Sequence, residues 1–276
     1  MVDLSMNLIR ASNAVDRLYR RFNRLREVAV VTLASDQALA EFNDRTYGEA
    51  SRYLPTSSGY VSGLYPWEER ALQEHFPPPP AHILVGGAGS GREPLALSDL
   101  GYRITAFEPV STLVQAMQQQ VSARGAISVG CYLGGYEELP FVKSPRGGES
   151  INLSELGPFD GGILGWGSFS HIPNERQRER TLGHFGQLTS GPVLLSFTST
   201  RGEGEIPSSG IKSRILKRKH RHPADRFSMS MGFQHPVTEH EIRELARRTG
   251  LAVVKIDFSH TSLAPHVVLQ RSTTSE

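Results

Sequence analysis

Apolar and polar residues near the N-terminus alternate at helical spacing. Five apolar residues stand three or four positions apart: Val15, Leu18, Tyr19, Phe22 and Leu25. Arginines fill the positions between them, so the pattern predicts an amphipathic helix with a basic outer face. A second helix is expected over residues 35–42, and a short one over residues 66–76.

The segment between these last two helices, residues 47–65, lacks such periodicity. It is rich in Tyr, Ser, Gly and Pro, which predicts an irregular loop that holds four tyrosines: Tyr47, Tyr53, Tyr60 and Tyr65. Four consecutive prolines occupy residues 77–80. Because proline lacks the amide N–H and clashes inside a helix, this run predicts a boundary between an N-terminal helical cap or lid, residues 1–80, and a core domain, residues 81–276.

From residue 81 onward, short apolar runs alternate with helical patterns. The runs predict strands at residues 82–85, 103–108, 127–131, 161–164, 193–198, 252–258 and 266–270. Helices are expected at residues 93–100, 111–123, 174–188 and 238–249. The alternation predicts an α/β fold with a mostly parallel, seven-stranded sheet that has helices on both faces and ends in an antiparallel hairpin. Residues 201–232 break the alternation and are interpreted as an insertion.

The composition, 38% hydrophobic and 21% charged, is ordinary for a soluble protein, and the net charge of +2 is too small to indicate nucleic acid as a partner. A lone cysteine, Cys131, excludes an intramolecular disulfide and a cysteine-based zinc site. The ten histidines show no metal-binding spacing, so no metal is expected. The longest apolar run, residues 28–34, is far shorter than the roughly 20 residues of a membrane span. Since the N-terminus also lacks a signal peptide's apolar core, we expect a cytoplasmic protein without membrane partners.

A glycine-rich turn follows the first predicted strand, in the stretch ILVGGAGSGRE at residues 83–93. Gly86 and Gly91 have the glycine spacing of a P-loop, but arginine and glutamate follow where that loop needs lysine and a hydroxyl residue. A dinucleotide site needs a glycine at the sixth position of Gly-x-Gly-x-x-Gly, and counted from Gly87 this position is Arg92. The turn therefore fits neither phosphate-binding motif well.

A carboxylate stands at the end of the second predicted strand, at Glu108. There it can accept both hydrogen bonds from a ribose diol, while Gly87, Gly89 and Gly91 let a phosphate-free ligand lie against the end of the first strand. This order of elements favours a nucleoside site. A tight strand–helix turn beside a solvated glutamate is the simpler alternative.

In this order, the motifs resemble the class I S-adenosylmethionine-dependent methyltransferase family. The glycine motif is GGAGSG, Glu108 lies in AFEPV, and three later stretches are also similar to the family: LGGYEELPF, FDGGILGWGSFSHIPNERQRERTL and FQHPVTEHEIRELARRTGL. The resemblance implies a Rossmann-like sheet, an enzyme that transfers a methyl group, and S-adenosylmethionine as its cofactor. It assigns to cofactor binding Gly87, Ala88, Gly89, Gly91, Glu108, Pro109, Tyr136, Glu137 and Trp166.

The sequence departs from the family pattern at two positions. Many members have Asp or Glu two residues before the first motif glycine, where this chain has Val85. The usual adenine-edge aspartate falls near Gly135, which leaves Tyr136, Glu137 or Glu138 as substitutes. Recognition of the methionine end is therefore expected to rest on backbone groups or on the N-terminal cap.

A histidine, His171, stands just past the fourth predicted strand, at the edge where open α/β sheets place their reactive crevice. Its ordinary pKa suits it to accept a proton from a phenol, acid or amine, which makes it the candidate catalytic base. Capping of a turn by His171 is an equally good interpretation. Trp166 is expected against the adenine, in the wall of the acceptor pocket, or in the core.

The remaining candidates belong to a lid over the acceptor. Tyr47, Tyr53 and Tyr60 combine an apolar ring with a polar tip, and a closed lid excludes water from a sulfonium. Arg92 is a candidate for pairing with a carboxylate, and Glu68 for the lid, although solvation is the simpler interpretation of both. A basic run within the insertion, residues 212–222, indicates either a solvated lid or an RNA-docking segment.

Together these features predict a methyltransferase that acts on an oxygen or nitrogen of a small-molecule acceptor. Two alternatives stay open: an RNA or protein methyltransferase that docks through the basic insertion, and a non-catalytic binding protein with a degenerate fold. The oligomeric state is also open, with a homodimer as one possibility.

Overall fold

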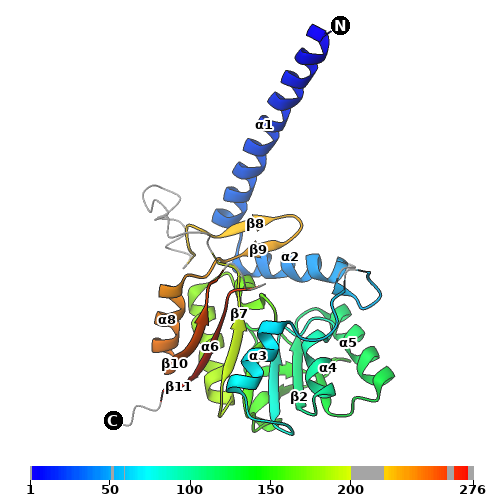
Figure 1. The fold of residues 1–276 in the computed structure, drawn as a ribbon, viewed down its shortest axis with the longest axis vertical. Coiled ribbons are helices and arrows are strands. Elements are labelled where there is room, and N and C mark those ends of the chain that lie inside the picture. The colour runs from blue at the N-terminus through cyan, green and yellow to red at the C-terminus, as the bar shows by residue number, and fades with distance from the viewer. Residues whose placement is uncertain (1, 51–52, 59, 200–220, 260–263, 273–276) are drawn as a thin grey trace.

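A nine-stranded sheet forms the centre of the computed structural model, which describes residues 2–50, 53–58, 60–199, 221–259 and 264–272 (Figure 1). The strands are β1 (His82–Gly86), β2 (Arg103–Glu108), β3 (Val129–Leu133), β4 (Phe141–Lys143), β5 (Ser150–Asn152), β6 (Gly161–Leu164), β7 (Val193–Ser196), β10 (Leu251–Asp257) and β11 (His266–Arg271). Across the sheet they run in the order β10-β11-β7-β6-β1-β2-β3-β4-β5.

The sheet has a parallel centre, in which β3, β2, β1, β6 and β7 all pair in parallel. At one side β11 and β10 follow as an antiparallel hairpin, which confirms the expected end of the sheet. The expected number of seven strands is wrong, because β4 and β5 extend the other edge as antiparallel strands. Each has three residues, too few for an alternation of apolar and polar positions to be visible in the sequence.

Helices cover both faces of the sheet, because successive residues of a strand point to opposite sides. The core helices are α4 (Arg92–Asp99), α5 (Ser111–Arg124), α6 (Glu175–Leu188) and α8 (Glu239–Arg248). Leu84 of β1 packs in one apolar cluster with Phe185 of α6, while Val85 packs in the opposite cluster with Met117 of α5. The predicted three-layer α/β arrangement is therefore confirmed.

Three helices precede the sheet: α1 (Val2–Leu33), α2 (Asp36–Glu49) and α3 (Pro66–His75). Trp67 of α3 joins the same cluster as Val85, so α3 packs directly on the sheet. Ser35 caps α2, and its side chain accepts a hydrogen bond from the backbone N–H of Ala38. Because α2 continues to Glu49, Tyr47 lies on a helix and not in the irregular loop where the sequence placed it. The division of the chain at residue 80 stays a prediction.

The first helix, α1, projects away from the rest of the molecule (Figure 1). The helix itself was expected, but its apolar residues remain in water, with exposed fractions between 63% and 70%: Val15, Leu18, Tyr19, Phe22 and Leu25. At its C-terminal end α1 does pack, through Val31. No helix in the described part of the chain is long and apolar enough to span a bilayer.

The second half of the insertion forms a hairpin of β8 (Arg226–Ser228) and β9 (Gly232–Gln234), which the sequence did not predict. Phe227 and Phe233 of this hairpin pack against Val31 of α1 and Leu39 of α2. Most of the basic run lies outside the described residues. Of its two described members, Arg221 is not solvated, because it is buried in an ion pair with Asp36. His222 is half-buried, and this burial lowers its pKa.

Two glycines in the left-handed region provide a matched test of the turn that leads into α4. A Cβ on Gly91, at φ 100°, lies 2.8 Å from Cγ of buried Met117, whereas a Cβ on Gly125, at φ 63°, meets no heavy atom within 4 Å. Gly125→Ala is expected to lower the free energy of unfolding by about 1 kcal/mol, the cost of the backbone conformation. Gly91→Ala adds overpacking and is expected to cost about 2–4 kcal/mol, measured by urea denaturation. Equal losses contradict a packing role for Gly91.

Candidate functional site

A pocket of about 670 Å³ lies where the parallel strands of the sheet end. The glycine turn, the end of β2, the loop after β6, α2 and the β8–β9 hairpin all contribute to its wall. Fourteen residues singled out in the sequence line it: Tyr47, Tyr53, Tyr60, Tyr65, Gly87, Ala88, Gly89, Arg92, Glu108, Pro109, Tyr136, Glu137, Trp166 and His171. Gly91 lies apart, at the N-cap of α4 against Met117.

The glycine turn and Glu108 form one side of the pocket. Gly89 has a positive φ of 55°, and a Cβ there meets no heavy atom within 4 Å, so this position faces open space. Its backbone N–H donates to Oε2 of Glu108 over 2.9 Å, and the N–H of Val110 donates to Oε1 over 3.2 Å. Burial raises the pKa of Glu108 to about 7, although both backbone donors favour the charged form. The carboxylate is thus fixed beside the pocket and keeps acceptor capacity for hydroxyl groups.

Arg92, at the start of α4, is held by two glutamates. Its guanidinium contacts both carboxylate oxygens of Glu68, each over 2.7 Å, and Oε1 of Glu93 over 2.6 Å. The side chains of all three residues are at most 10% exposed, so solvation is excluded for Arg92 and Glu68. Glu93 also accepts from the backbone N–H of Trp166 over 3.1 Å. Two carboxylates and one guanidinium therefore form a rigid charged corner, of which Arg92 and Glu93 line the pocket.

Aromatic side chains stand over this charged corner. The ring of Tyr65 lies 5.4 Å from the ring of Trp166, measured between centroids, and the guanidinium of Arg92 lies 4.4 Å from the centre of the Tyr65 ring. Trp166 is 50% exposed, which excludes its interpretation as a core residue. It therefore forms part of the pocket wall.

His171 also lines the pocket, and it is the last residue of the 3₁₀ turn η3 (Ser168–His171). Its Nδ1 lies 2.7 Å from the carbonyl oxygen of Phe233, which can only accept, so Nδ1 carries the proton. Its Nε2 is then an acceptor, and it lies 2.7 Å from Oη of Tyr47, which donates. Burial lowers the pKa of His171, so the ring is neutral at pH 7. Tyr47 and His171 thus form a polarised pair at the pocket.

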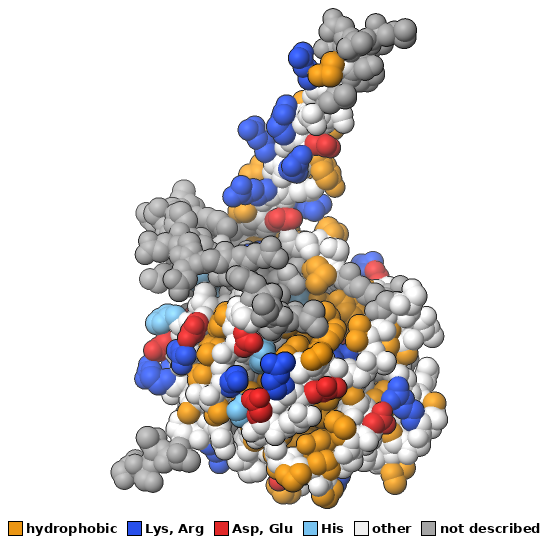
Figure 2. Space-filling view, viewed as in Figure 1, with side chains coloured by type: hydrophobic (Ala, Val, Ile, Leu, Met, Phe, Trp, Pro, Cys, Tyr) orange, Lys and Arg blue, Asp and Glu red, His pale blue; other side chains and the backbone are white. Residues whose placement is uncertain are grey.

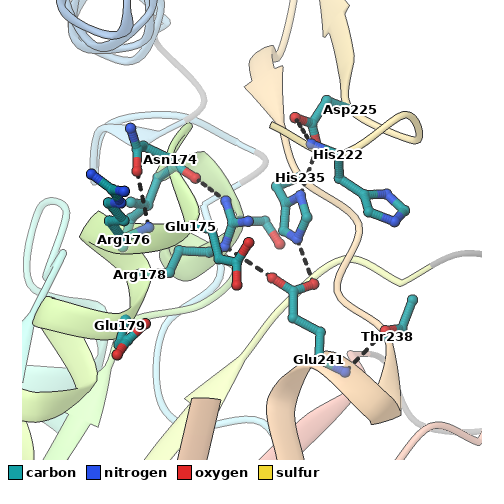
Figure 3. A network of polar contacts seen from close by, with 12 residues as sticks. Asn174, Glu175, Arg176, Arg178, Glu179, His222, Asp225, His235, Thr238 and Glu241 are labelled. Carbon is teal, nitrogen blue, oxygen red and sulfur yellow. Dashed lines mark hydrogen bonds and ion pairs between the residues drawn. The ribbon is translucent and has the colours of Figure 1, made fainter. Parts of the chain in front are cut away.

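A buried ionic network holds the segment that carries His171 (Figure 3). His235 lies between two carboxylates, with Nδ1 2.6 Å from Asp225 and Nε2 2.7 Å from Glu241. Arg178 donates to Glu241 over 3.1 Å and to the carbonyl of Ile172, next to His171, over 2.8 Å. The backbone N–H of His235 donates to the carbonyl of Ser170 over 2.7 Å. Both sides of His171 in the chain are therefore fixed by this network.

Charge pairing sets the protonation states within the network. Burial and the nearby Arg178 oppose a proton on His235, but Glu241 and Asp225 outweigh them and raise the pKa of its imidazole. Burial likewise opposes charge on Glu241, yet His235 and Arg178 lower its pKa to about 2. The network is thus a charged imidazolium and a guanidinium between two carboxylates.

Several residues of the site were missed in the sequence. Asn43 of α2 donates to the carbonyl of His171 over 3.4 Å and accepts from the backbone N–H of Phe233 over 2.8 Å. Asp44 also lines the pocket, and burial together with Glu137 raises its pKa to about 6. These polar positions in the middle of a helix carry no local signal, because their partners are more than 90 positions away.

The fold is similar to that of solved methyltransferases. The CcbJ methyltransferase of Streptomyces caelestis is 14% identical, with a TM-score of 0.58 over 82% of this chain and 98% of that one. A 1,6-didemethyltoxoflavin-N1-methyltransferase of Burkholderia thailandensis, solved with 1,6-didemethyltoxoflavin and S-adenosylhomocysteine, is 18% identical, with a TM-score of 0.58 over 86% and 89%. Magnesium protoporphyrin IX methyltransferase of Synechocystis, solved with S-adenosylmethionine, is 14% identical, with a TM-score of 0.53 over 86% and 98%.

No protein-family model matches the sequence, and no curated protein is significantly similar to it. At such low identities, the structural likeness establishes the fold. The chain therefore has the fold of the class I S-adenosylmethionine-dependent methyltransferases.

The network makes a prediction about stability and pH. Glu241→Gln leaves His235 and Arg178 buried without their shared carboxylate, so the free energy of unfolding is expected to fall by about 3–5 kcal/mol at pH 6. Because the pKa of Glu241 is about 2 when folded and 4.5 ordinarily, its contribution is present above pH 4.5 and is lost as the pH falls through 2. The difference between wild type and Glu241→Gln, measured by urea denaturation, should therefore shrink across this range.

An exposed glutamate on the same helix is the matched control. Glu244 pairs with Arg247 at the surface of α8, and Glu244→Gln is expected to leave stability nearly unchanged. A gap between wild type and Glu241→Gln that stays constant from pH 6 to pH 2 contradicts the assigned charge on Glu241.

Proposed function

We propose that this chain is an S-adenosylmethionine-dependent methyltransferase that methylates an oxygen or nitrogen of a small-molecule acceptor. The observation that carries the proposal is Glu108, fixed by two backbone donors beside the open face of Gly89. Both lie at the carboxyl ends of β1 and β2, within the methyltransferase fold. This is where open α/β sheets bind their ligands.

Glu108 fits the ribose of the cofactor. Its carboxylate is buried, and the donors that hold it use one site on each oxygen, which leaves each oxygen able to accept from a ribose hydroxyl. Gly89 allows the sugar to approach, since any larger side chain there has to project into the open space. Tyr136 and Glu137, which follow β3 in the chain, also line the pocket, and we assign them to the adenine.

The charged corner fits the amino-acid end of the cofactor and accounts for the apolar residue at Val85. That residue is fully buried in the core, so an acid is absent where many family members have one. We assign Glu93 to accept from the α-ammonium group. Both Nη groups of Arg92 already donate to Gly63, Glu68 and Glu93, so we assign its Nε–H to donate to the α-carboxylate. Glu68 does not line the pocket and acts by holding the guanidinium of Arg92 in place.

The Tyr47–His171 pair fits the acceptor side. Bound S-adenosylmethionine would supply the methyl group to the attacking acceptor, and its sulfur would keep the electron pair of the broken carbon–sulfur bond. Tyr47 takes the acceptor's proton at Oη and passes its own proton to Nε2 of His171. The resulting imidazolium stays bound to the carbonyl of Phe233, so the positive charge lost at sulfur reappears on His171. Tyr47 and His171 thus act as one base.

The tyrosines around the pocket support a lid that would exclude water from the reacting groups. Tyr47 and Tyr53 lie with ring centroids 4.8 Å apart, and Tyr60 and Tyr65 line the same wall. We assign them, with α2, to a lid over the acceptor.

Calorimetry with two ligands tests the cofactor site. Glu108→Gln is expected to weaken the binding of both S-adenosylmethionine and methylthioadenosine, since both ligands carry the ribose. The wild type should lose affinity for both as the pH falls below about 7 and Glu108 becomes protonated, whereas the affinity of Glu108→Gln should not change with pH in this range. Glu93→Gln is expected to weaken S-adenosylmethionine about 10- to 100-fold and to leave methylthioadenosine unchanged, because that ligand lacks the amino-acid end. Absence of binding by both S-adenosylmethionine and S-adenosylhomocysteine to the wild type refutes the enzyme proposal.

Turnover tests the base, measured as transfer of labelled methyl groups to a panel of phenols, carboxylic acids and amines. His171→Ala and Tyr47→Phe are each expected to lower turnover about 100-fold or more, while cofactor affinity stays nearly intact. Because the two residues act in series, the double variant is expected to be no slower than either single one. Burial lowers the pKa of His171, so wild-type activity should fall on the acid side only below pH 6.5.

An exposed histidine on α8 serves as the control, and His240→Ala is expected to keep full turnover. Unchanged turnover in His171→Ala dismisses the base. Methyl transfer to RNA or protein, with none to the panel, overturns the small-molecule acceptor.

A further inference from the structure

The projecting helix α1 carries an apolar stripe along a face that nothing in the described part of the chain covers. Its large side chains are mostly exposed: Val15, Leu18, Tyr19, Phe22 and Leu25. Figure 2 shows orange and blue side chains interspersed along this helix, well clear of the globular body. An isolated helix gains little stability from hydrogen bonds alone, and a long apolar stripe in water indicates an interaction surface.

The spacing of the stripe is that of a coiled coil. From Leu4 to Ala29, apolar residues occupy every position of an alternating four-three pattern in the sequence: Leu4, Leu8, Ala11, Val15, Leu18, Phe22, Leu25 and Ala29. This pattern repeats every seven residues, and a straight helix drifts by about 20° per repeat relative to it. A helix that lies on a flat surface such as a membrane is expected to repeat its apolar residues with the helical period of 3.6. An unbroken seven-residue repeat instead indicates pairing with a second helix, around which the first one supercoils.

We propose that α1 pairs with α1 of a second copy of this chain as an antiparallel coiled coil. Charge decides the direction. In a parallel pair, Arg21 of one helix lies beside Arg26 of the other, at the flanking positions where natural pairs place opposite charges. Two such Arg–Arg contacts destabilise the parallel arrangement. The antiparallel arrangement removes them.

The antiparallel register follows from the sizes of the seam residues. When Val15 lies opposite Leu18 of the partner, Phe22 lies opposite Ala11, the smallest residue opposite the largest. In the same register Arg21 lies opposite Ala14 and Arg26 opposite Ser5. No like charges meet across the stripe in this register, and the stripe covers about 40 Å of helix. The contact is isologous, so it closes at two copies.

The oligomeric state tests the proposal directly. In analytical ultracentrifugation the wild-type chain is expected to have twice its monomer mass. The double variant Leu18→Glu/Leu25→Glu is expected to be a monomer. Asn13→Glu with Asn23→Glu adds the same charge to α1 outside the seam and is expected to remain a dimer. Because residues 10–25 lie on the projecting part of α1, the urea midpoint of the globular body should be the same in both variants.

Cross-linking tests the direction, in a Cys131→Ser background. An equal mixture of Ala11→Cys and Phe22→Cys chains is expected to form disulfide-linked dimers on oxidation, while Phe22→Cys alone is not, since antiparallel pairing separates the two copies of that residue by about 16 Å. A cross-link in Phe22→Cys alone overturns the antiparallel arrangement. A monomeric wild type overturns the proposal, and binding of that monomer to phosphatidylserine vesicles assigns the stripe to a membrane surface instead. None of these outcomes depends on methyl transfer.

Discussion

The candidate site depends on one buried interaction: an imidazolium, His235, held between the carboxylates of Asp225 and Glu241. Buried charges are costly unless each is paired, and here Arg178 completes the compensation. The same groups reach the backbone on both sides of His171, through the carbonyls of Ser170 and Ile172. The orientation of the proposed base is thus set by charges that do not touch the pocket.

A second charge cluster contributes to the wall of the pocket. Arg92 pairs with both Glu68 and Glu93, and the three side chains fix one another before any ligand arrives. Charged groups that are already oriented need little rearrangement when they meet a charged ligand, which favours tight and specific binding. Glu108 and the glycine turn, joined by the hydrogen bond from the backbone N–H of Gly89, line the same pocket. Two networks of charged side chains therefore hold residues of the pocket wall, to which several tyrosines also contribute.

The residues of the site differ in whether the sequence alone could predict their place. Glu108 and the turn at Gly87 and Gly89 were found because their chemistry depends on neighbours in the chain: strand, turn, helix, strand. The Arg92–Glu68 pair was not found, since 24 positions separate its members and each is typical of a solvated helix. Tyr47 was recognised as a pocket residue but placed in a loop, because the glycine after it obscured the end of α2.

The sequence by itself determined the parallel sheet, the helices on its faces and the glycine–glutamate floor, because periodicity and turn chemistry act over a few residues. The coiled-coil pattern of α1 was also present in the sequence as an amphipathic repeat. Only the tertiary structure decided that the apolar face of α1 stays exposed, that Arg92 is buried, and that His235, Glu241 and Arg178 support His171. These outcomes depend on which distant segments of the chain come into contact. Those contacts, rather than the neighbours in the sequence, determine the free energy of burying a charge or an apolar side chain.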